Sequence, residues 1–129
     1  MKQAGLDALQ QTFAALADPT RLRIVGLLLS GEVCVCHIHE TLRIPQPKAS
    51  RHLAYLRKSG LVTATKRGLW VHYALAEPRD AATADVLAAI KASVSGLDRT
   101  RRDRARLERT MCCVGPAADR AAHGAPRGR

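Results

Sequence analysis

The sequence predicts a small, mainly helical domain that carries one β-hairpin, and two patterns support this fold class. Apolar residues recur every three or four positions over most of the chain, which is typical of amphipathic helices. Between residues 61 and 75 the pattern changes to alternation on both sides of an Arg-Gly pair, which is typical of two strands joined by a tight turn. The chain has 129 residues, enough for one domain with one modest core.

The first two predicted helices span residues of about 5–17 and 19–29. Asp18 separates them, and its side chain is expected to accept hydrogen bonds from the free backbone N–H groups of the second helix. Pro19 suits the first turn of that helix, where its missing donor costs nothing. Apolar residues nearly encircle the second helix, so we expect it to be buried, and Ser30-Gly31 should end it.

Two short helices are predicted next, at residues of about 34–42 and 47–59, with a proline-containing turn between them. The second has an apolar face and a polar, basic face, and Gly60 is placed as its left-handed cap. Two such helices form a helix-turn-helix pattern. The hairpin follows directly, with Lys66 and Arg67 at its tip. The combination predicts a winged helix-turn-helix with the element order α-α-α-α-β-β-α.

A last helix is predicted from Ala81 to Leu97, with a continuation through the arginines to Met111. Its apolar residues and those of the first helix form stripes that the small core cannot fully use, so we expect the terminal helices to form a dimer interface. The arginine-rich stretch of residues 99–109 is expected to be a solvated or partly frayed helix end. We predict a DNA-binding and dimerisation domain at residues 1–111 and a flexible, Cys-Cys-containing tail at residues 112–129.

The charge pattern favours a polyanionic partner. The formal net charge is +10, and no Asp or Glu occurs between Thr41 and Ala76, a span with seven Lys and Arg residues. The longest apolar stretch is far shorter than the roughly 20 residues that a bilayer-spanning helix needs, and no signal-peptide core is present. We therefore expect a cytoplasmic protein with no membrane partner, in which four cysteines indicate metal or redox chemistry rather than structural disulfides.

Five segments together resemble the arsenical-resistance repressor (ArsR/SmtB) family of winged-helix metal sensors, in the pattern of the arsenical resistance operon repressors. The similarity covers roughly residues 8–76, and its carriers are Leu16–Ile24, Gly31–Cys36, Gln46–Leu56, Ser59–Val62 and Gly68–Tyr73. The resemblance implies a homodimeric repressor, bound to a palindromic operator in double-stranded DNA and released when a thiophilic metal or metalloid binds. It implies no organic cofactor and no enzymatic activity.

The resemblance places the recognition helix at residues 46–59 and the wing at the hairpin. The side chains expected to contact phosphates and base edges are Gln46, Lys48, Ser50, Arg51, His52, Lys66 and Arg67. Leu53 and Leu56 are packing positions.

Cys34 and Cys36 resemble the sensing motif of the family. A regular helix turns about 100° per residue, so two thiols two positions apart should point to opposite sides unless the first turn is distorted. A pair of small buried core residues is the alternative interpretation. Relatives that sense arsenite often have a third cysteine where this chain has His39, and Cys112 or Cys113 could complete the site instead, within or across subunits.

The ligand set leaves the inducer partly open. Trivalent arsenic, as arsenite or an organoarsenical, or antimonite is the preferred inducer. His37 and His39 are secondary candidate ligands that would suit zinc or cadmium, and a cadmium-, lead- or zinc-responsive repressor is an alternative. A repressor of the same fold that responds to thiol oxidation or sulfide is another. An enzyme is disfavoured, because no cysteine is followed six positions later by arginine and no CxxC pair or glycine-rich nucleotide loop occurs.

Overall fold

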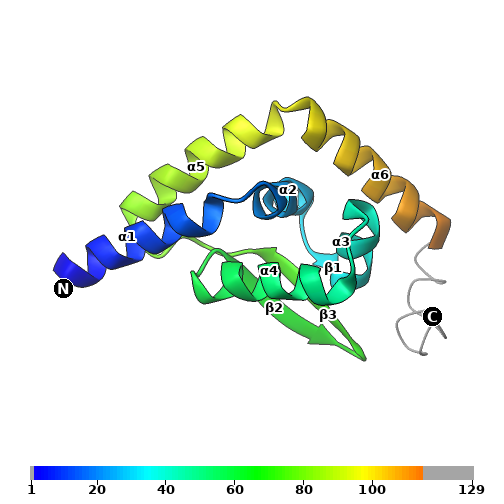
Figure 1. Ribbon diagram of the computed structural model, residues 1–129, viewed down its shortest axis with the longest axis horizontal. Helices are drawn as coiled ribbons and strands as arrows, with labels where there is room; N and C mark the ends of the chain where they lie inside the picture. The colour runs from blue at the N-terminus through cyan, green and yellow to red at the C-terminus, as the bar shows by residue number, and fades with distance from the viewer. Residues whose placement is uncertain (1, 115–129) are drawn as a thin grey trace.

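Six α-helices and a small sheet make up the part of the chain that the structure describes (Figure 1). The structure is a computed structural model, and it describes residues 2–114 and the side chains of residues 5–111. The elements in chain order are α1 (Lys2–Leu16), α2 (Pro19–Leu27), the 3₁₀ turn η1 (Leu28–Ser30), β1 (Val33–Cys34), α3 (Val35–Leu42), α4 (Gln46–Lys58), β2 (Val62–Arg67), β3 (Trp70–Leu75), α5 (Ala81–Ser95) and α6 (Asp98–Val114).

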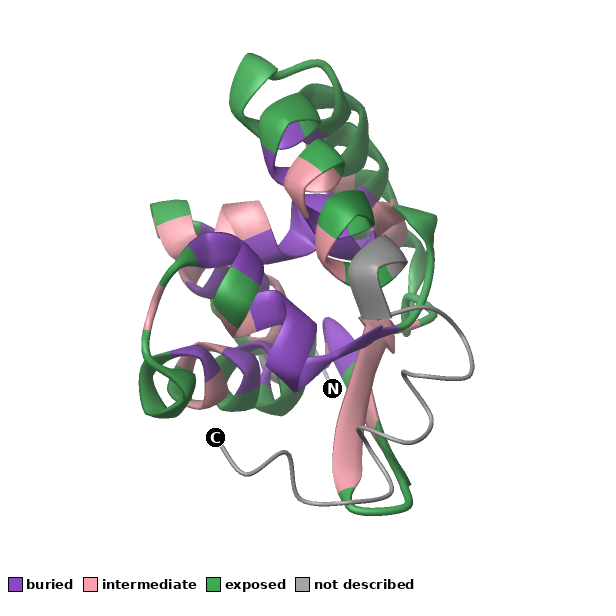
Figure 2. Cartoon of the chain, turned by 90° about the vertical axis from the view of Figure 1, so that its right-hand side faces the viewer, coloured by how far each residue is buried: buried purple, intermediate pink, exposed green. Residues whose placement is uncertain are grey.

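The start of α2 forms as the sequence predicts. The Asp18 carboxylate accepts a hydrogen bond from the backbone N–H of Arg21 at 3.0 Å, and Pro19 occupies the first turn. The second half of α2 is buried, with Ile24, Val25 and Leu27 fully inside. Buried residues gather at the centre of the domain, whereas the tip of the hairpin and the outer turns of the helices are exposed (Figure 2).

The sheet has three antiparallel strands in the order β1-β3-β2. Strands β2 and β3 form the predicted hairpin, with Arg67 opposite Trp70 and a turn at Gly68, whose φ of 65° suits glycine. Strand β1 was not predicted, because two residues are too few to show alternation. It pairs with β3 and places Cys34 opposite His72.

The predicted last helix is two helices, α5 and α6, separated at Gly96 and Leu97. Asp98 then begins α6, where an acidic side chain is favourable. The expectation of a solvated or frayed arginine-rich end is wrong for one face of this helix, because Thr100, Asp103 and Leu107 recur there and are all buried. The other face is solvated as predicted, with Arg99, Arg101, Arg102 and Arg109 exposed. Helix α6 packs against α2 and α3 of its own chain (Figure 1).

An ion pair fastens α6 to α2. The guanidinium of Arg23 donates from Nε and Nη2 to the two carboxylate oxygens of Asp103, both at 2.9 Å. The Asp103 side chain is only 2% exposed, whereas that of Arg23 is 29% exposed. Hydrogen bonding to Asp103 raises the pKa of Arg23 above its ordinary value.

The apolar stripes predicted on the terminal helices are only partly buried within one chain. Helices α1 and α5 lie side by side (Figure 1), and Leu16 and Leu87 are buried. Leu6, Phe13 and Leu97 remain about half exposed or more. Within residues 2–114, every helix is too short or too polar to span a lipid bilayer.

Candidate nucleic-acid interface and thiol pair

Helix α4 presents a polar face because three of its apolar residues form one inward face, whereas Ala54 and Tyr55 are exposed. Ala49, Leu53 and Leu56 are completely buried. Pro45 precedes the helix and Pro47 lies in its first turn, which fixes the start of the helix without a donor that would need a partner. Of the predicted DNA contacts in this helix, Gln46, Lys48 and Arg51 are exposed and Ser50 is half-buried.

The turn between α3 and α4 fixes their relative orientation. Arg43 adopts a left-handed conformation, with φ 59° and ψ 46°, and caps the end of α3. Its N–H and that of Ile44 donate to the carbonyls of Glu40 and His39 at 3.2 and 3.1 Å. This is the tight turn that a helix-turn-helix requires.

His52 lies against α2 rather than on the exposed face of α4. Its Nδ1 is 3.2 Å from Nη1 of Arg21 and 3.9 Å from the Asp18 carboxylate, and its side chain is 17% exposed. Burial lowers the pKa of His52; Asp18 opposes this effect, and the nearby cations add to it. The neutral imidazole therefore accepts a hydrogen bond from Arg21. A DNA contact by His52 stays a prediction.

Arg21 is a residue of this region whose role the sequence did not reveal. Its Nε donates to the Ala15 carbonyl at 2.6 Å, and its Nη2 donates to the Ala14 carbonyl at 3.3 Å. The guanidinium also lies over the Tyr55 ring, 4.1 Å from the ring centre. Arg21 thus joins α1, α2 and α4. In the sequence, the only sign that Arg21 has a role is its position in a segment that carries the family resemblance.

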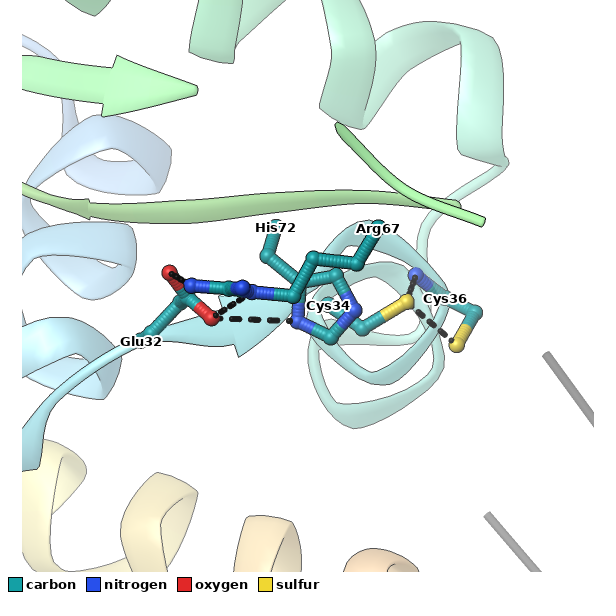
Figure 3. Close-up of polar contacts among 5 residues, drawn as sticks. All are labelled: Glu32, Cys34, Cys36, Arg67 and His72. Carbon is teal, nitrogen blue, oxygen red and sulfur yellow. Dashed lines mark hydrogen bonds and ion pairs between the residues drawn. The ribbon is translucent and has the colours of Figure 1, made fainter. Parts of the chain in front are cut away.

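The hairpin places Lys66 and Arg67 at its tip, where both are exposed. Arg67 is not free: its Nε and Nη2 donate to the two carboxylate oxygens of Glu32 at 2.7 and 3.0 Å. Nδ1 of His72 lies 3.6 Å from the same carboxylate (Figure 3). Hydrogen bonding to Arg67 lowers the pKa of Glu32, and the charge of His72 contributes. Sequence reasoning missed Glu32, because nothing local indicates a partner 35 residues away.

Cys34 and Cys36 lie together at the start of α3. Cys34 ends β1 and caps α3 in an extended conformation, and its Sγ accepts a hydrogen bond from the N–H of Cys36 at 3.4 Å. The two Sγ atoms are 2.9 Å apart, and both side chains are buried (Figure 3). The expectation that the helix must be distorted to bring the thiols together is wrong, because Cys34 stands outside the helix and the 100° rotation does not apply to it.

The structure does not gather the candidate histidines around the thiols. His37 is buried, contrary to the usual solvent-facing position of a helix histidine, and Nδ1 of His39 lies 3.3 Å from the Ile44 carbonyl at the α3–α4 turn. Within the described residues, no three His, Cys, Asp or Glu side chains form a group that could hold a metal ion. The chemistry available there is a pair of adjacent thiols, which suits a soft ion.

Helix α6 packs against α3, the helix that begins at the thiol pair. A pocket is lined by Ser30 at the end of η1, Glu32 in the loop before β1, Val33 of β1, and Leu107 and Met111 of α6. Arg104 of α6 donates a hydrogen bond to Ser30. Cys112 and Cys113 follow Met111 in the helix, and their side chains lie outside the described residues, so their predicted role as ligands stays a prediction.

A helix-turn-helix with an exposed basic face, followed by a hairpin wing, defines a winged helix-turn-helix protein, the fold of many transcriptional regulators. The profile described as "bacterial regulatory protein, arsR family" matches residues 18–64. An HTH-type transcriptional regulator of Methanocaldococcus jannaschii is 46% identical over 70 residues, which cover 54% of this chain and 79% of that protein. The chain therefore belongs to the ArsR family.

Two further relatives support this assignment. The arsenical resistance operon repressor of Escherichia coli K12 is 58% identical over 66 residues, which cover 50% of this chain and 56% of that protein. The solution structure of a homodimeric winged helix-turn-helix DNA-binding domain from Mycobacterium bovis, a possible ArsR-family regulator, has a TM-score of 0.63 and 32% identity, and covers 71% of this chain and 82% of that one. The family consists of transcriptional regulators and not of enzymes, as the sequence predicts.

Proposed function

We propose that this chain is a homodimeric repressor that binds a palindromic operator and dissociates when trivalent arsenic or antimony binds its thiols. The observation that carries the proposal is the Cys34–Cys36 pair, whose sulfur atoms lie 2.9 Å apart at the start of the first helix of the helix-turn-helix. Its site of action would be the cytoplasm, where operator DNA lies.

The DNA contacts in this proposal come from two surfaces. The exposed Gln46, Lys48 and Arg51 of α4 enter the major groove, where an arginine can bind the O6 and N7 atoms of guanine. Ser50 and His52 would contact the backbone beside them. Lys66 and Arg67 at the tip of the hairpin contact phosphates or the minor groove. Losing Arg51 should weaken specific binding by about 1–3 kcal/mol if it contacts a base.

Two subunits are needed to bind both halves of a palindrome. Leu6 and Phe13 of α1 and Leu97 after α5 are large apolar side chains that the described chain leaves exposed. The homodimeric state of the Mycobacterium bovis domain supports an interface of this kind. We assign the interface to the terminal helices α1 and α5, because burying these side chains in a second copy removes apolar surface from water.

The response arises from the capping position of Cys34. Its sulfur accepts the Cys36 N–H at 3.4 Å, so the side chain caps the first turn of α3, although sulfur is a weaker acceptor than the oxygen of Ser, Thr, Asp or Asn. Arsenite, As(OH)3, would exchange two of its hydroxyl groups for the two thiols and release two water molecules. This would hold both side chains in one new geometry and change the first turn of α3. Because α3 packs against α4, the change alters the angle at which α4 meets DNA.

A third thiolate would complete the coordination that arsenic(III) prefers. The last described side chain of α6 is Met111, which lines a pocket together with Val33, the residue before Cys34. The next two residues of the helix are Cys112 and Cys113. We therefore propose that one of them ligates within the same subunit, since α6 is already fastened to its own α2 by Arg23 and Asp103.

The experiment that tests this function uses a palindromic duplex selected by the protein from a random pool. Fluorescence anisotropy of the labelled duplex follows its release as arsenite, antimonite, cadmium, lead or zinc is added under reductant. We expect arsenite and antimonite to release the DNA. Cys34→Ser and Cys36→Ser should bind the duplex as tightly as the unaltered protein and fail to respond.

Three results would contradict the proposal in different ways. Release by cadmium, lead or zinc alone would assign a divalent metal as the inducer. Release only after oxidation or addition of sulfide would assign a thiol-redox response. Loss of DNA binding in both serine variants, together with a lower melting temperature, would mean that the thiols are structural.

A further inference from the structure

Glu32 contacts the wing and lies in the loop that leads into the thiol pair. It lies two residues before Cys34, and Figure 3 shows its carboxylate facing the guanidinium of Arg67 on one side and the ring of His72 on another. Arg67 ends β2 at the tip of the hairpin, and it makes two hydrogen bonds to Glu32, at 2.7 and 3.0 Å. The contact therefore joins the loop before β1 to the part of the wing that faces outward.

This pairing uses the edge of Arg67 that would otherwise bind DNA. A guanidinium binds a carboxylate and a phosphate in the same forked geometry, with two parallel N–H donors. Nε and Nη2 of Arg67 are both committed to Glu32. A DNA phosphate that takes the same two donors must displace the carboxylate.

We propose that Glu32 is a positioning residue for the wing: it holds Arg67 against the loop before β1 in the free protein and competes with the DNA backbone for it. This inference rests on the proposed DNA-binding function. Glu32 is the one acidic residue that reaches the tip of the wing within the described chain, although the segment from Thr41 to Ala76 has no acid of its own. The wing therefore has a built-in counterion, which weakens DNA binding.

The same contact places the wing under the influence of the thiol pair. Cys34 pairs with His72 across β1 and β3, and His72 lies 3.6 Å from the Glu32 carboxylate. A shift of β1 moves Glu32 with it, because only Val33 separates Glu32 from Cys34. The strength of the hold on Arg67 therefore depends on the position of β1.

The neighbouring Lys66 provides a matched control. It lies at the same tip and is exposed, but within the described residues it forms no ion pair. Lys66→Gln removes one cation from the wing and leaves the Glu32–Arg67 pair in place. Glu32→Gln keeps the shape of the side chain and removes its charge.

The test measures the affinity of the selected palindromic duplex for six proteins: the unaltered chain, Glu32→Gln, Arg67→Gln, Lys66→Gln, and Glu32→Gln combined with each of the latter two. Exposed ion pairs are weak, so we expect Glu32→Gln to raise the affinity by about two- to fivefold near physiological salt. The salt dependence should become steeper, by up to about 0.9 in log K per log salt for each wing of the dimer. The gain should vanish in the Arg67→Gln background and persist in the Lys66→Gln background.

Several outcomes would overturn the inference. An equal gain with and without Arg67 would show a general charge effect, and no gain or a loss would show that Glu32 does not compete. If Glu32→Gln fails to fold, the Nε–H resonance of Arg67 in the unaltered protein decides: it should move when the duplex is added, and a stationary resonance overturns the role of Glu32. Failure of the unaltered protein to bind any duplex would instead overturn the proposed function.

Discussion

Breaking the Arg23–Asp103 pair from either side should have unequal effects on stability. Removing Arg23 leaves a carboxylate that is 2% exposed and has lost both of its hydrogen bonds from Arg23. Stranding a buried charge costs about 3–5 kcal/mol. Asp103→Asn leaves Arg23, which is 29% exposed and can turn toward water, so the loss should be about 1–2 kcal/mol.

The comparison uses Arg23→Met and Asp103→Asn, with the double variant Arg23→Met/Asp103→Leu as control. Urea denaturation followed by circular dichroism, at one fixed protein concentration, gives the free energy of unfolding of each. The double variant should be more stable than Arg23→Met, because it leaves no unpaired charge. Equal losses in the two single variants, or a larger loss for Asp103→Asn, would refute this explanation of how α6 is held.

Three further predictions concern packing, pH and the end of α6. Gly26→Ala should lower the free energy of unfolding by about 1–3 kcal/mol, because the added Cβ would lie 3.0 Å from Cγ2 of Thr100 and 3.2 Å from Cγ1 of Val94. Thermal melts that show no loss of stability would contradict this prediction. His52 has a folded-state pKa below its unfolded value, so its contribution to stability is present above about pH 6.5 and is lost as the pH falls through the folded pKa. The difference in stability between the unaltered protein and His52→Gln should therefore shrink from pH 7 to pH 5. A difference that stays constant would contradict this prediction. Cys112→Ser/Cys113→Ser should raise the arsenite concentration needed to release DNA at least tenfold without changing DNA affinity, and an unchanged dose curve would remove these residues from the site.

Local patterns predicted most of the fold correctly. The Asp18 cap, the inward face of α4 and the hairpin with its turn at Gly68 follow from residue types and spacings within a few positions. The burial of one face of α6 was not foreseen, because its arginine-rich composition suggests solvent and the acid that anchors it, Asp103, pairs with a residue 80 positions away. Pairing between distant residues depends on the tertiary arrangement, which local patterns do not contain.

The candidate site was predicted only in part for the same reason. The family motif placed Cys34 and Cys36 at one site, yet their adjacency depends on the extended conformation of Cys34, which a short strand and a capping position impose together. The basic face of α4 was predicted from its helical spacing. The ion pair between Glu32 and Arg67 and the contact of Arg21 with Tyr55 of α4 were not predicted, because each joins segments that are distant in sequence.

The most direct test of the account is the response of backbone amides in the helix-turn-helix to arsenite, measured by NMR on the reduced protein without DNA. The account predicts that saturating arsenite changes the amide shifts and speeds hydrogen exchange in the first turn of α3, residues 35–38, and also shifts the amides of α4. Cys34→Ser should abolish both changes. Arsenite that binds and releases DNA while the amides of α3 and α4 stay unchanged would contradict the proposed coupling between the thiol pair and the recognition helix.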